Sequence, residues 1–423
     1  MKIAIIGGGT AGFIAAAYLS RAYPQFEMVH IYDTTLPTIG VGEGTTPPLR
    51  HWLKTHVQRP FDELETTGSL TRKYGIAFEG WGQRQPAFLH NFYPERQEYA
   101  YHVDAAEMVG WLRPTVVAEH VDKPVTAVIN SGLSATIRFA DATTLTADFV
   151  IDARGFPRQL NDDEHIQFGV IPTNSALVCH GPPCAQQQMT RSVARPHGWL
   201  FVIPLRTRTS YGYVFNRDIT AVPDAEADLA AFLVDEGVVA PTNQRQLNFP
   251  NFCRRTFFDG TTFYLGNAAA FLEPLEATAI GFIVLQMRAF GRWPLGQLAY
   301  KQRRERLLAL RNLFTFNGYL QRTISDYALF IGWHYAQGSQ YDTPFWRFAQ
   351  ANWQEQLAAW PDPDSRVRFE QFLAAGLETQ RLRREAVQTQ AAFERKEPRN
   401  GTSFAGWPSA SFAEVGHGIG YYA

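Results

Sequence analysis

The sequence of 423 residues is poor in cysteine, in excess charge of either sign and in long apolar runs. Its three cysteines, Cys179, Cys184 and Cys253, are too few for a disulfide framework, which predicts reduced thiols and a cytoplasmic protein. Lys plus Arg total 39 against 40 Asp plus Glu, so the net charge of −1 predicts no nucleic acid and no anionic membrane as partner. No apolar run approaches the length of a membrane-spanning helix, and the N-terminus lacks a signal-peptide pattern.

The composition is that of a folded protein, with 45% hydrophobic and 19% charged residues. The length allows two or three units, or one large α/β domain with insertions. Cys179, His180 and Cys184 lie close together in the sequence, but no second ligand pair stands at zinc spacing, so no metal is expected.

The first forty residues contain a nucleotide-binding pattern. Lys2–Ile6 predicts a buried strand and Phe13–Arg21 a helix, with a G-x-G-x-x-G turn between them. In such a turn the first glycine permits the bend, the second lets the backbone approach a pyrophosphate, and the third allows close helix packing. A second strand, Glu27–Tyr32, ends at Asp33, whose carboxylate can accept hydrogen bonds from ribose hydroxyls. The residues expected to bind a dinucleotide here are Gly7, Gly9, Thr10, Ala11, Gly12 and Asp33.

Later segments favour FAD over NAD. Ala147–Ala153 and Thr262–Asn267 each predict a strand that runs into a turn of small residues. FAD monooxygenase-like folds return two such strands to the nucleotide domain, and the second supplies amides and a polar side chain, here Asn267. An N-terminal NAD domain does not need these returns.

Five further segments, in this order along the chain, resemble the flavin-dependent tryptophan halogenases. They are Ile39–Pro47 (IGVGEGTTP), Thr71–Phe78 around Lys73, Gly198–Pro204 (GWLFVIP), Phe271–Ile280 (FLEPLEATAI) and Tyr341–Trp346 (YDTPFW). The resemblance runs from Met1 to about Tyr421. It implies that FADH2 from a separate NAD(P)H-dependent flavin reductase reacts with O2, and that chloride or bromide is oxidised to hypohalous acid. The acid then travels to a lysine beside an aromatic substrate.

The resemblance assigns catalytic roles to Lys73 and Glu276. An amine can hydrogen-bond hypohalous acid or form a haloamine, and a carboxylate can polarise the oxidant and accept the ring proton. Without the resemblance, Lys73 would be interpreted as a solvated lysine after Arg72, and Glu276 as an acid at a helix N-terminus. The resemblance also implies halide binding at Thr278 and Ala279, and FAD contacts at Val41, Glu43 and Ile280.

Two positions depart from the family pattern. Ala279 replaces a glycine, and a Cβ there is expected to crowd the halide site or to conflict with the backbone conformation of a glycine. Phe201 replaces a second tryptophan in a segment that separates substrate from flavin. Trp199, Phe201 and Ile203 also alternate as one face of a strand would, so core packing is the alternative interpretation.

The resemblance places the substrate ring between His90 and Phe92 on one side and Trp407 on the other. Stacking of this kind contributes about 0.5–1.5 kcal/mol per aromatic pair. A structural histidine and a C-terminal anchoring tryptophan are the alternatives for His90 and Trp407.

The residues that hold free tryptophan in the family are missing. Arg395 and Lys396 replace two tyrosines, Thr402 replaces a glutamate and Gly406 a phenylalanine. We therefore expect an indole compound, a phenol or a peptide-borne aromatic as substrate. Arg395, Lys396 and Arg399 either bind a carboxylate of the substrate or form a solvated charge run.

The expected fold is α/β, with an FAD-binding Rossmann-like core of the monooxygenase/halogenase type, a mixed sheet layer and a mostly helical C-terminal region. Residues 1–280 are expected to form the FAD-binding core with substrate-facing insertions, and residues 281–423 the substrate-covering region. Gln302–Leu313 and Phe369–Phe393 predict amphipathic helices because they are rich in helix formers and lack proline.

Two other functions are compatible with the sequence. A flavin monooxygenase on the same scaffold would hydroxylate an indole or a peptidyl tryptophan, which Ala279 and Phe201 favour and Lys73 opposes. A flavin-binding protein without chemistry would bind a peptide partner, but the presence of both Lys73 and Glu276 opposes it. The halide, the reductase and the oligomeric state, with a homodimer among the options, stay open.

Overall fold

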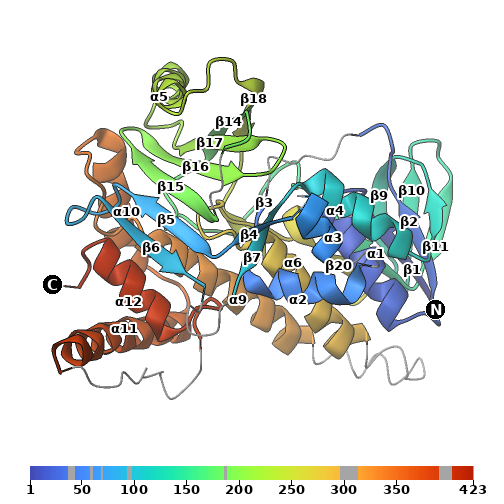
Figure 1. Ribbon diagram of the computed structural model, residues 1–423. Helices are drawn as coiled ribbons and strands as arrows, with labels where there is room; N and C mark the ends of the chain where they lie inside the picture. The colour runs from blue at the N-terminus through green and yellow to red at the C-terminus, as the bar shows by residue number, and fades with distance from the viewer. Residues whose placement is uncertain are drawn as a thin grey trace.

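The computed structural model describes residues 1–36, 43–57, 61–67, 70–92, 98–184, 188–295, 313–389 and 403–422. Figure 1 shows three regions: a parallel sheet at the N-terminal side, a larger sheet above the middle, and helices at the C-terminal side. Within the described ranges, no helix combines the length and the hydropathy needed to cross a membrane.

A parallel sheet of five strands forms the N-terminal region, in the order β20-β12-β1-β2-β8. Its strands are β1 Lys2–Ile6, β2 Glu27–Ile31, β8 Glu119–Val121, β12 Phe149–Asp152 and β20 Thr262–Tyr264. The first two confirm the predicted strands to within one residue, and α1 Thr10–Ala22 confirms the predicted helix. β12 and β20 confirm the two returning strands, because β12 pairs in parallel with both β1 and β20.

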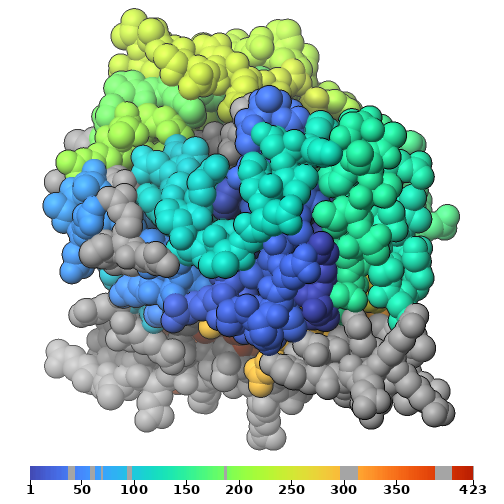
Figure 2. All heavy atoms as spheres, turned by 90° about the vertical axis from the view of Figure 1, so that its right-hand side faces the viewer, coloured from blue at the N-terminus to red at the C-terminus, as the bar shows by residue number. Residues whose placement is uncertain are grey.

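A helix and a small sheet lie against this region. α4 Ala105–Leu112 packs on α1, and an antiparallel sheet is formed by β9 Val125–Asn130, β10 Ala135–Phe139 and β11 Thr144–Ala147. In Figure 2 these residues, coloured cyan to green, cover the face beside the blue N-terminal residues.

A second, mixed sheet has seven strands in the order β18-β14-β17-β16-β15-β5-β6. Its strands are β5 Gly75–Glu79, β6 Ala87–Asn91, β14 Ser175–Gly181, β15 Met189–Arg195, β16 Gly198–Pro204, β17 Thr209–Phe215 and β18 Thr242–Asn248. Only the β5–β15 pair is parallel within the sheet as described. On β16, Trp199, Phe201 and Ile203 point into the main core, whereas Leu200 and Val202 pack beneath α5 Val222–Asp235.

Two short sheets and two helices connect these regions. The sheets are β3 Glu43–Gly44 with β7 Ala100–Val103 and β4 Leu70–Lys73, and β13 His165–Gln167 with β19 Phe252–Arg254 and β21 Ala270–Phe271. The helices are α2 Pro47–His56 and α3 Phe61–Thr67.

The C-terminal region is helical in its described part. Its helices are α6 Ala279–Phe290, which continues as a π-helical turn Gly291–Leu295, α9 Leu313–Trp333, α10 Pro344–Ala358, α11 Pro363–Thr389 and α12 Ser409–Gly418. α11 contains most of the predicted helix Phe369–Phe393, whose last four residues lie outside the described ones. Of the predicted helix Gln302–Leu313 only Leu313 is described, as the first residue of α9. The predicted α/β class, with a Rossmann-like core, a mixed sheet and a mostly helical C-terminal part, is confirmed.

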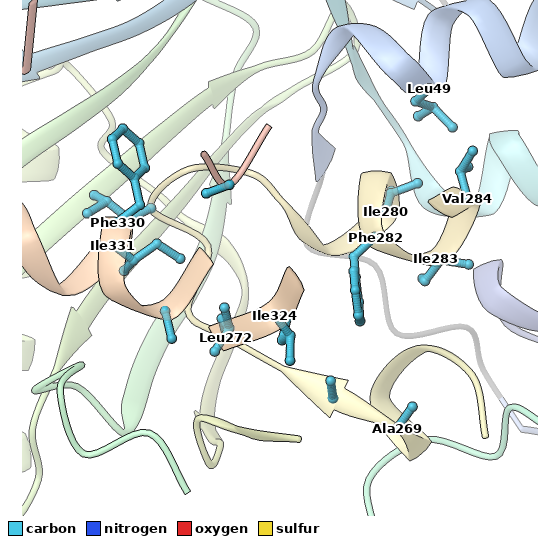
Figure 3. Packing of buried hydrophobic residues seen from close by; sticks show 14 of the residues in the cluster. Leu49, Ala269, Leu272, Ile280, Phe282, Ile283, Val284, Ile324, Phe330 and Ile331 are labelled. Atoms are coloured by element: carbon cyan, nitrogen blue, oxygen red, sulfur yellow. The ribbon is translucent and has the colours of Figure 1, made fainter. Parts of the chain in front are cut away.

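Helix α6 packs against several elements at once because it is apolar on most of its circumference. In Figure 3, Ile280 and Val284 lie on the side of α6 that faces Leu49 of α2, and Phe282 points toward the side where Ile324 of α9 lies. All five side chains are buried in the main core. This packing fixes the N-terminus of α6, and with it Glu276 three residues before the helix.

Candidate active site

Lys73 lies at the end of β4 with its side chain fully buried, and its Nζ has no hydrogen-bond partner. Its neighbour Arg72 points outward and forms an ion pair with Glu65, with 2.6 Å between nitrogen and oxygen. The Lys73 Nζ lies 5.2 Å from the ring centre of Phe92. The interpretation of Lys73 as a solvated lysine is therefore wrong, because the strand alternation turns Arg72 to water and Lys73 inward.

Burial changes the acidity of Lys73. Removal from water lowers the pKa of its ammonium to about 7, although the negative charge of Glu276 acts in the opposite direction. Both the charged and the neutral amine are therefore populated at neutral pH. A neutral amine is nucleophilic, and the buried position keeps competing water away from it.

The space around the Lys73 amine is narrow. A Cβ added to Gly44 of β3 would lie 3.1 Å from Lys73 Nζ, 3.1 Å from Thr190 Oγ1 and 3.6 Å from Ala277 Cβ. Thr190 Oγ1 is also 2.9 Å from Nε2 of the buried His102. Burial lowers the pKa of His102 well below its ordinary value, and the charge of Lys73 adds to this effect. His102 is thus held neutral.

We expect Gly44→Ala to reduce catalytic efficiency by about tenfold while leaving the thermal unfolding temperature nearly unchanged. The added methyl group forces the Lys73 amine or the Thr190 hydroxyl to shift by a few tenths of an ångström. Steady-state kinetics and thermal unfolding would measure the two effects. Gly110→Ala in α4 is the matched control, because a Cβ there meets no atom within 4 Å. Equal activity of the two variants would contradict the expectation.

Glu276 is fully buried between two histidines. His90 of β6 has its Nδ1 3.2 Å from Glu276 Oε1, and His334, which follows α9, has its Nε2 2.9 Å from the same oxygen. The other oxygen, Oε2, has no hydrogen-bond partner. The carboxylate is therefore fixed through one oxygen, and the second oxygen remains free to accept a proton.

The three groups shift one another's protonation. Burial alone would raise the pKa of Glu276, but the positive charge of His90 and hydrogen bonds from both histidines hold that pKa at about 2. Burial would lower the pKa of His90, but the charge and hydrogen bond of Glu276 raise it above its ordinary value. Glu276 is therefore an ionised carboxylate at neutral pH, despite its full burial.

The turn between β1 and α1 forms an open cradle of backbone amides. A Cβ on Gly12 would lie 1.9 Å from the carbonyl oxygen of Gly7, whereas a Cβ on Gly9 would meet nothing within 4 Å. Gly9 is the N-cap residue of α1, no side chain caps the helix, and its first turn holds no acid. Open space therefore lies next to Gly9, at the positive end of the helix dipole where the amides of Thr10 and Ala11 begin the helix. A pyrophosphate fits this cradle, and a side chain at Gly9 would fill it.

We expect Gly9→Ala to weaken FAD binding by at least about tenfold, or about 1.4 kcal/mol, without loss of stability. The backbone of Gly9 (φ −88°, ψ −173°) is open to any residue, so the apoprotein should unfold at its normal temperature. Titration of FAD fluorescence measures the affinity. Gly12→Ala should instead destabilise the apoprotein itself, because its Cβ overlaps a backbone carbonyl. Unchanged FAD affinity in Gly9→Ala would show that the pyrophosphate does not bind at this turn.

Of the other predicted FAD contacts, Asp33 and Asn267 follow strands of the five-stranded sheet, whereas Glu43 belongs to the short sheet β3-β7-β4. Asp33 follows β2, and its Oδ1 accepts hydrogen bonds from the amide and the hydroxyl of Thr35. Asn267 lies in a 3-10 turn directly after β20, at the carboxyl edge. Burial, reinforced by Asp104, raises the pKa of Glu43 in β3 to about 7. Val41 lies outside the described residues.

Comparison with known proteins decides the family. The sequence pattern of the family described as tryptophan halogenase matches residues 2–97 and 93–362. The chain belongs to the tryptophan halogenase family. The chemistry of this flavin-dependent family uses FAD, a halide and O2, and its members are oxidoreductases that generally act with a separate flavin reductase on an aromatic substrate.

Individual relatives are distant. Tryptophan 6-halogenase ThaL of Streptomyces albogriseolus and tryptophan 7-halogenase RebH of Lentzea aerocolonigenes are each 24% identical, over 82% of this chain and 78% of their own. Among solved structures, the flavin-dependent halogenase BrvH of Brevundimonas sp. BAL3 superposes with a TM-score of 0.77 at 21% identity. That superposition covers 100% of this chain and 90% of BrvH.

In this member of the tryptophan halogenase family, Ala279 does not conflict with the backbone. It is the first residue of α6 and is not among the described residues with positive φ, so a side chain is tolerated there. The left-handed conformation instead falls on Ala277, with φ 54°. Thr278, the N-cap residue, and Ile280 are buried, whereas Ala279 is exposed. The expected backbone conflict at Ala279 is therefore wrong.

The predicted substrate walls are in direct contact with each other. The rings of Phe92 and Trp407 stack with centroids 5.5 Å apart, and His90 meets Trp407 edge to face at 4.6 Å. A third ring between two others needs about 7 Å, so a stacked substrate requires one wall to move by about 1.5 Å. Trp407 is carried by a tight turn in which Ala405 and Gly406 both have positive φ, 52° and 77°.

The clamp positions of the family are only partly described. Gly406 lies in the turn before Trp407 and offers no side chain, while Arg395, Lys396, Arg399 and Thr402 lie outside the described residues. As for metals, the described residues contain no group of three or more His, Cys, Asp or Glu side chains placed to hold an ion.

Sequence reasoning missed three polar side chains of the site. His334 contacts Glu276 from a position 58 residues later in the chain, and His102 and Thr190 line the lysine pocket from two different sheets. No motif surrounds His334, and its only local signal is a strongly aromatic segment, Trp333-His334-Tyr335. Residues of this kind can be assigned to a site only from the contacts in the folded structure.

Proposed function

We propose that this chain halogenates an electron-rich aromatic ring, an indole compound or a peptide-borne aromatic rather than free tryptophan, with Lys73 as the halogen carrier. The observation that carries the proposal is the buried, unpartnered amine of Lys73 beside the ionised carboxylate of Glu276. Gly406 in place of a tryptophan-binding phenylalanine supports a substrate other than the free amino acid.

FAD fits the amide cradle at Gly9, and we assign Asp33, Glu43, Asn267 and Ile280 to further contacts with it. When bound, reduced FAD would provide, with O2, the oxidising chemistry that converts a halide to hypohalous acid. The amides at Thr278 and Ala279 begin a helix without a side-chain cap, and we assign them to the halide.

The amine and the carboxylate then divide the chemistry. The neutral Lys73 Nζ takes the electrophilic halogen from hypohalous acid, which forms an N–halogen bond and releases water. Transfer to a ring carbon forms the carbon–halogen bond and breaks the N–halogen bond. Glu276 Oε2 accepts the ring proton, which returns to Lys73. A pKa of about 2 suffices for this step, because a halogenated ring cation is far more acidic.

A mass-spectrometric assay tests the proposal. The protein is incubated with FAD, NADH, a generic flavin reductase, O2 and NaBr, and with indole, tryptophan or an indole-containing peptide. A bromine isotope doublet on indole or peptide, absent without bromide and weak on tryptophan, is the expected result. Replacement of NaBr by NaCl measures the halide preference.

Hydroxylation is the alternative function. A product 16 Da heavier that forms without halide would replace the halogenase by a monooxygenase on the same scaffold. Phe201, which stands where the family has a tryptophan, favours this alternative, whereas the burial of Lys73 opposes it because hydroxylation needs no halogen carrier.

A further inference from the structure

A cavity of about 770 Å3 runs along α6, and its size suits an organic molecule rather than a few waters. Thr278 and Trp407 line it, and Trp407 packs against His90, which in turn contacts Glu276, so this end of the cavity lies next to the catalytic residues. Arg288 and Arg292 line it as well, further along the same helix and its π-helical extension. Because a helix rises about 1.5 Å per residue, Thr278 and Arg288 are separated by about 15 Å along the axis. The cavity is thus much longer than a single indole ring.

The arginine end of this cavity carries positive charge that no acid among the described residues neutralises. Both guanidinium groups are exposed, and no ion pair or hydrogen bond to either is found among the described residues. Glu98, an acid of the cavity wall, is already 3.6 Å from Arg50 and 3.5 Å from His51. Burial raises the pKa of Tyr18, another wall residue, and the charge of Arg288 opposes that rise, so the guanidinium acts on the cavity.

Aromatic side chains line the cavity between its ends. Trp293 meets Tyr319 edge to face with ring centroids 5.1 Å apart, and Tyr327 and Trp407 complete this part of the wall. Trp293 and Tyr319 are 37% and 39% exposed, so each ring presents apolar surface that a ligand can cover. A flat or apolar chain would pack against these rings, whereas a bare anion would not need them.

We propose that the substrate is an elongated aromatic acid, with its reactive ring at the Trp407 end and an anionic group bound by Arg288 and Arg292. The guanidinium fork matches a carboxylate in two parallel hydrogen bonds, and no acidic side chain in the described part of the chain pairs with it. The proposal rests on the proposed function and names the class of its substrate. It also accounts for the absence of a clamp close to the ring, because the charged group is held about 15 Å away.

Indole-3-acetyl-triglycine and its C-terminal amide test the proposal, because they share the ring and the length and differ by one charge. Three extended residues span about 10 Å, within reach of an arginine side chain at the far end. Calorimetry on the apoprotein measures binding, and the bromination assay measures kcat/KM. We expect the acid to bind at least tenfold more tightly than the amide, and this preference to fall as salt is added.

The double variant Arg288→Gln/Arg292→Gln should bind acid and amide equally, with affinity for the amide unchanged. Arg384→Gln, an exposed arginine of α11 outside the cavity wall, is the matched control and should keep the preference. Equal binding of acid and amide by the unaltered protein, or a preference that survives in the double variant, overturns the proposal. Selective binding of the acid without any brominated product would overturn the proposed function alone.

Discussion

Lys73→Met should abolish halogenation, with a fall in rate of at least about a thousandfold, and at the same time make the protein more stable at pH 7. In the proposed function the Lys73 amine carries the halogen, and no other described side chain is assigned to that role. Its burial without a hydrogen-bond partner is unfavourable to folding, and methionine fills similar space without charge. Bromide-dependent mass spectrometry and denaturant unfolding measure the two effects. Arg72→Met, on the outward face of the same strand, is the matched control and should retain activity.

The sign of the pH dependence follows from the lowered pKa of Lys73. Between pH 7 and about 10.5 the unfolded chain binds the lysine proton and the folded chain does not, so the stability of the unaltered protein rises with pH in this window. The advantage of Lys73→Met should therefore shrink as pH rises from 7 to 10.5. Bromination should rise about tenfold between pH 6 and 8 as the amine becomes neutral. An advantage that grows with pH, or a rate that falls above pH 7, would contradict a neutral buried amine.

Glu276→Gln should reduce the rate by at least about a hundredfold, because the amide cannot accept the ring proton. It should also destabilise the fold by about 3 kcal/mol near pH 5.5, since two buried histidines lose their carboxylate. The lowered pKa of Glu276 stabilises the fold above about pH 4.5 and stops doing so as pH falls through 2. The raised pKa of His90 stabilises it below pH 6.5 and stops doing so as pH rises through that pKa.

The destabilisation by Glu276→Gln should therefore be largest between pH 4.5 and 6.5 and decline at pH 8. Unfolding by urea at these pH values measures it. Glu273→Gln is the matched control: this glutamate is equally buried, accepts hydrogen bonds from Tyr335 and Thr173, and has a pKa raised by burial to about 7. Glutamine resembles its protonated form, so the loss should be smaller and free of the pH 4.5–6.5 maximum. If the loss of unfolding free energy depended on pH in the same way for both variants, the two histidines would contribute nothing to the stability provided by Glu276.

The nucleotide-binding unit could be predicted from sequence because its signals are local. The strand Lys2–Ile6, the turn around Gly9 and the acid Asp33 follow one another within the first forty residues, and each residue type has a single steric or hydrogen-bonding reason. The halogenase residues needed the resemblance, since Lys73 alone gives no sign of burial. His334 and the cavity arginines could not be predicted, because only the packing of α6 and α9 brings His334 to Glu276 and places Arg288 and Arg292 on a cavity wall.

The backbone of Ala279 was mispredicted for a different reason. A family glycine suggested a left-handed residue at that position, but the structure puts the positive φ two residues earlier, at Ala277. A single substitution therefore did not reveal where the turn before α6 bends. Only the observed dihedral angles distinguish a glycine kept for its conformation from one kept for space.

The turn at Ala405–Gly406 has a consequence for how such an enzyme can be altered. It presents Trp407 from a stretch of chain, residues 403–422, that contributes none of the assigned cofactor, halide or halogen-carrying residues. In the proposed function, this part of the substrate site is thereby encoded apart from the residues assigned to halide oxidation. A chimera that takes this C-terminal stretch and the arginines of α6 from a relative should acquire the substrate preference of that relative. Its rate of halide oxidation should stay that of the recipient protein.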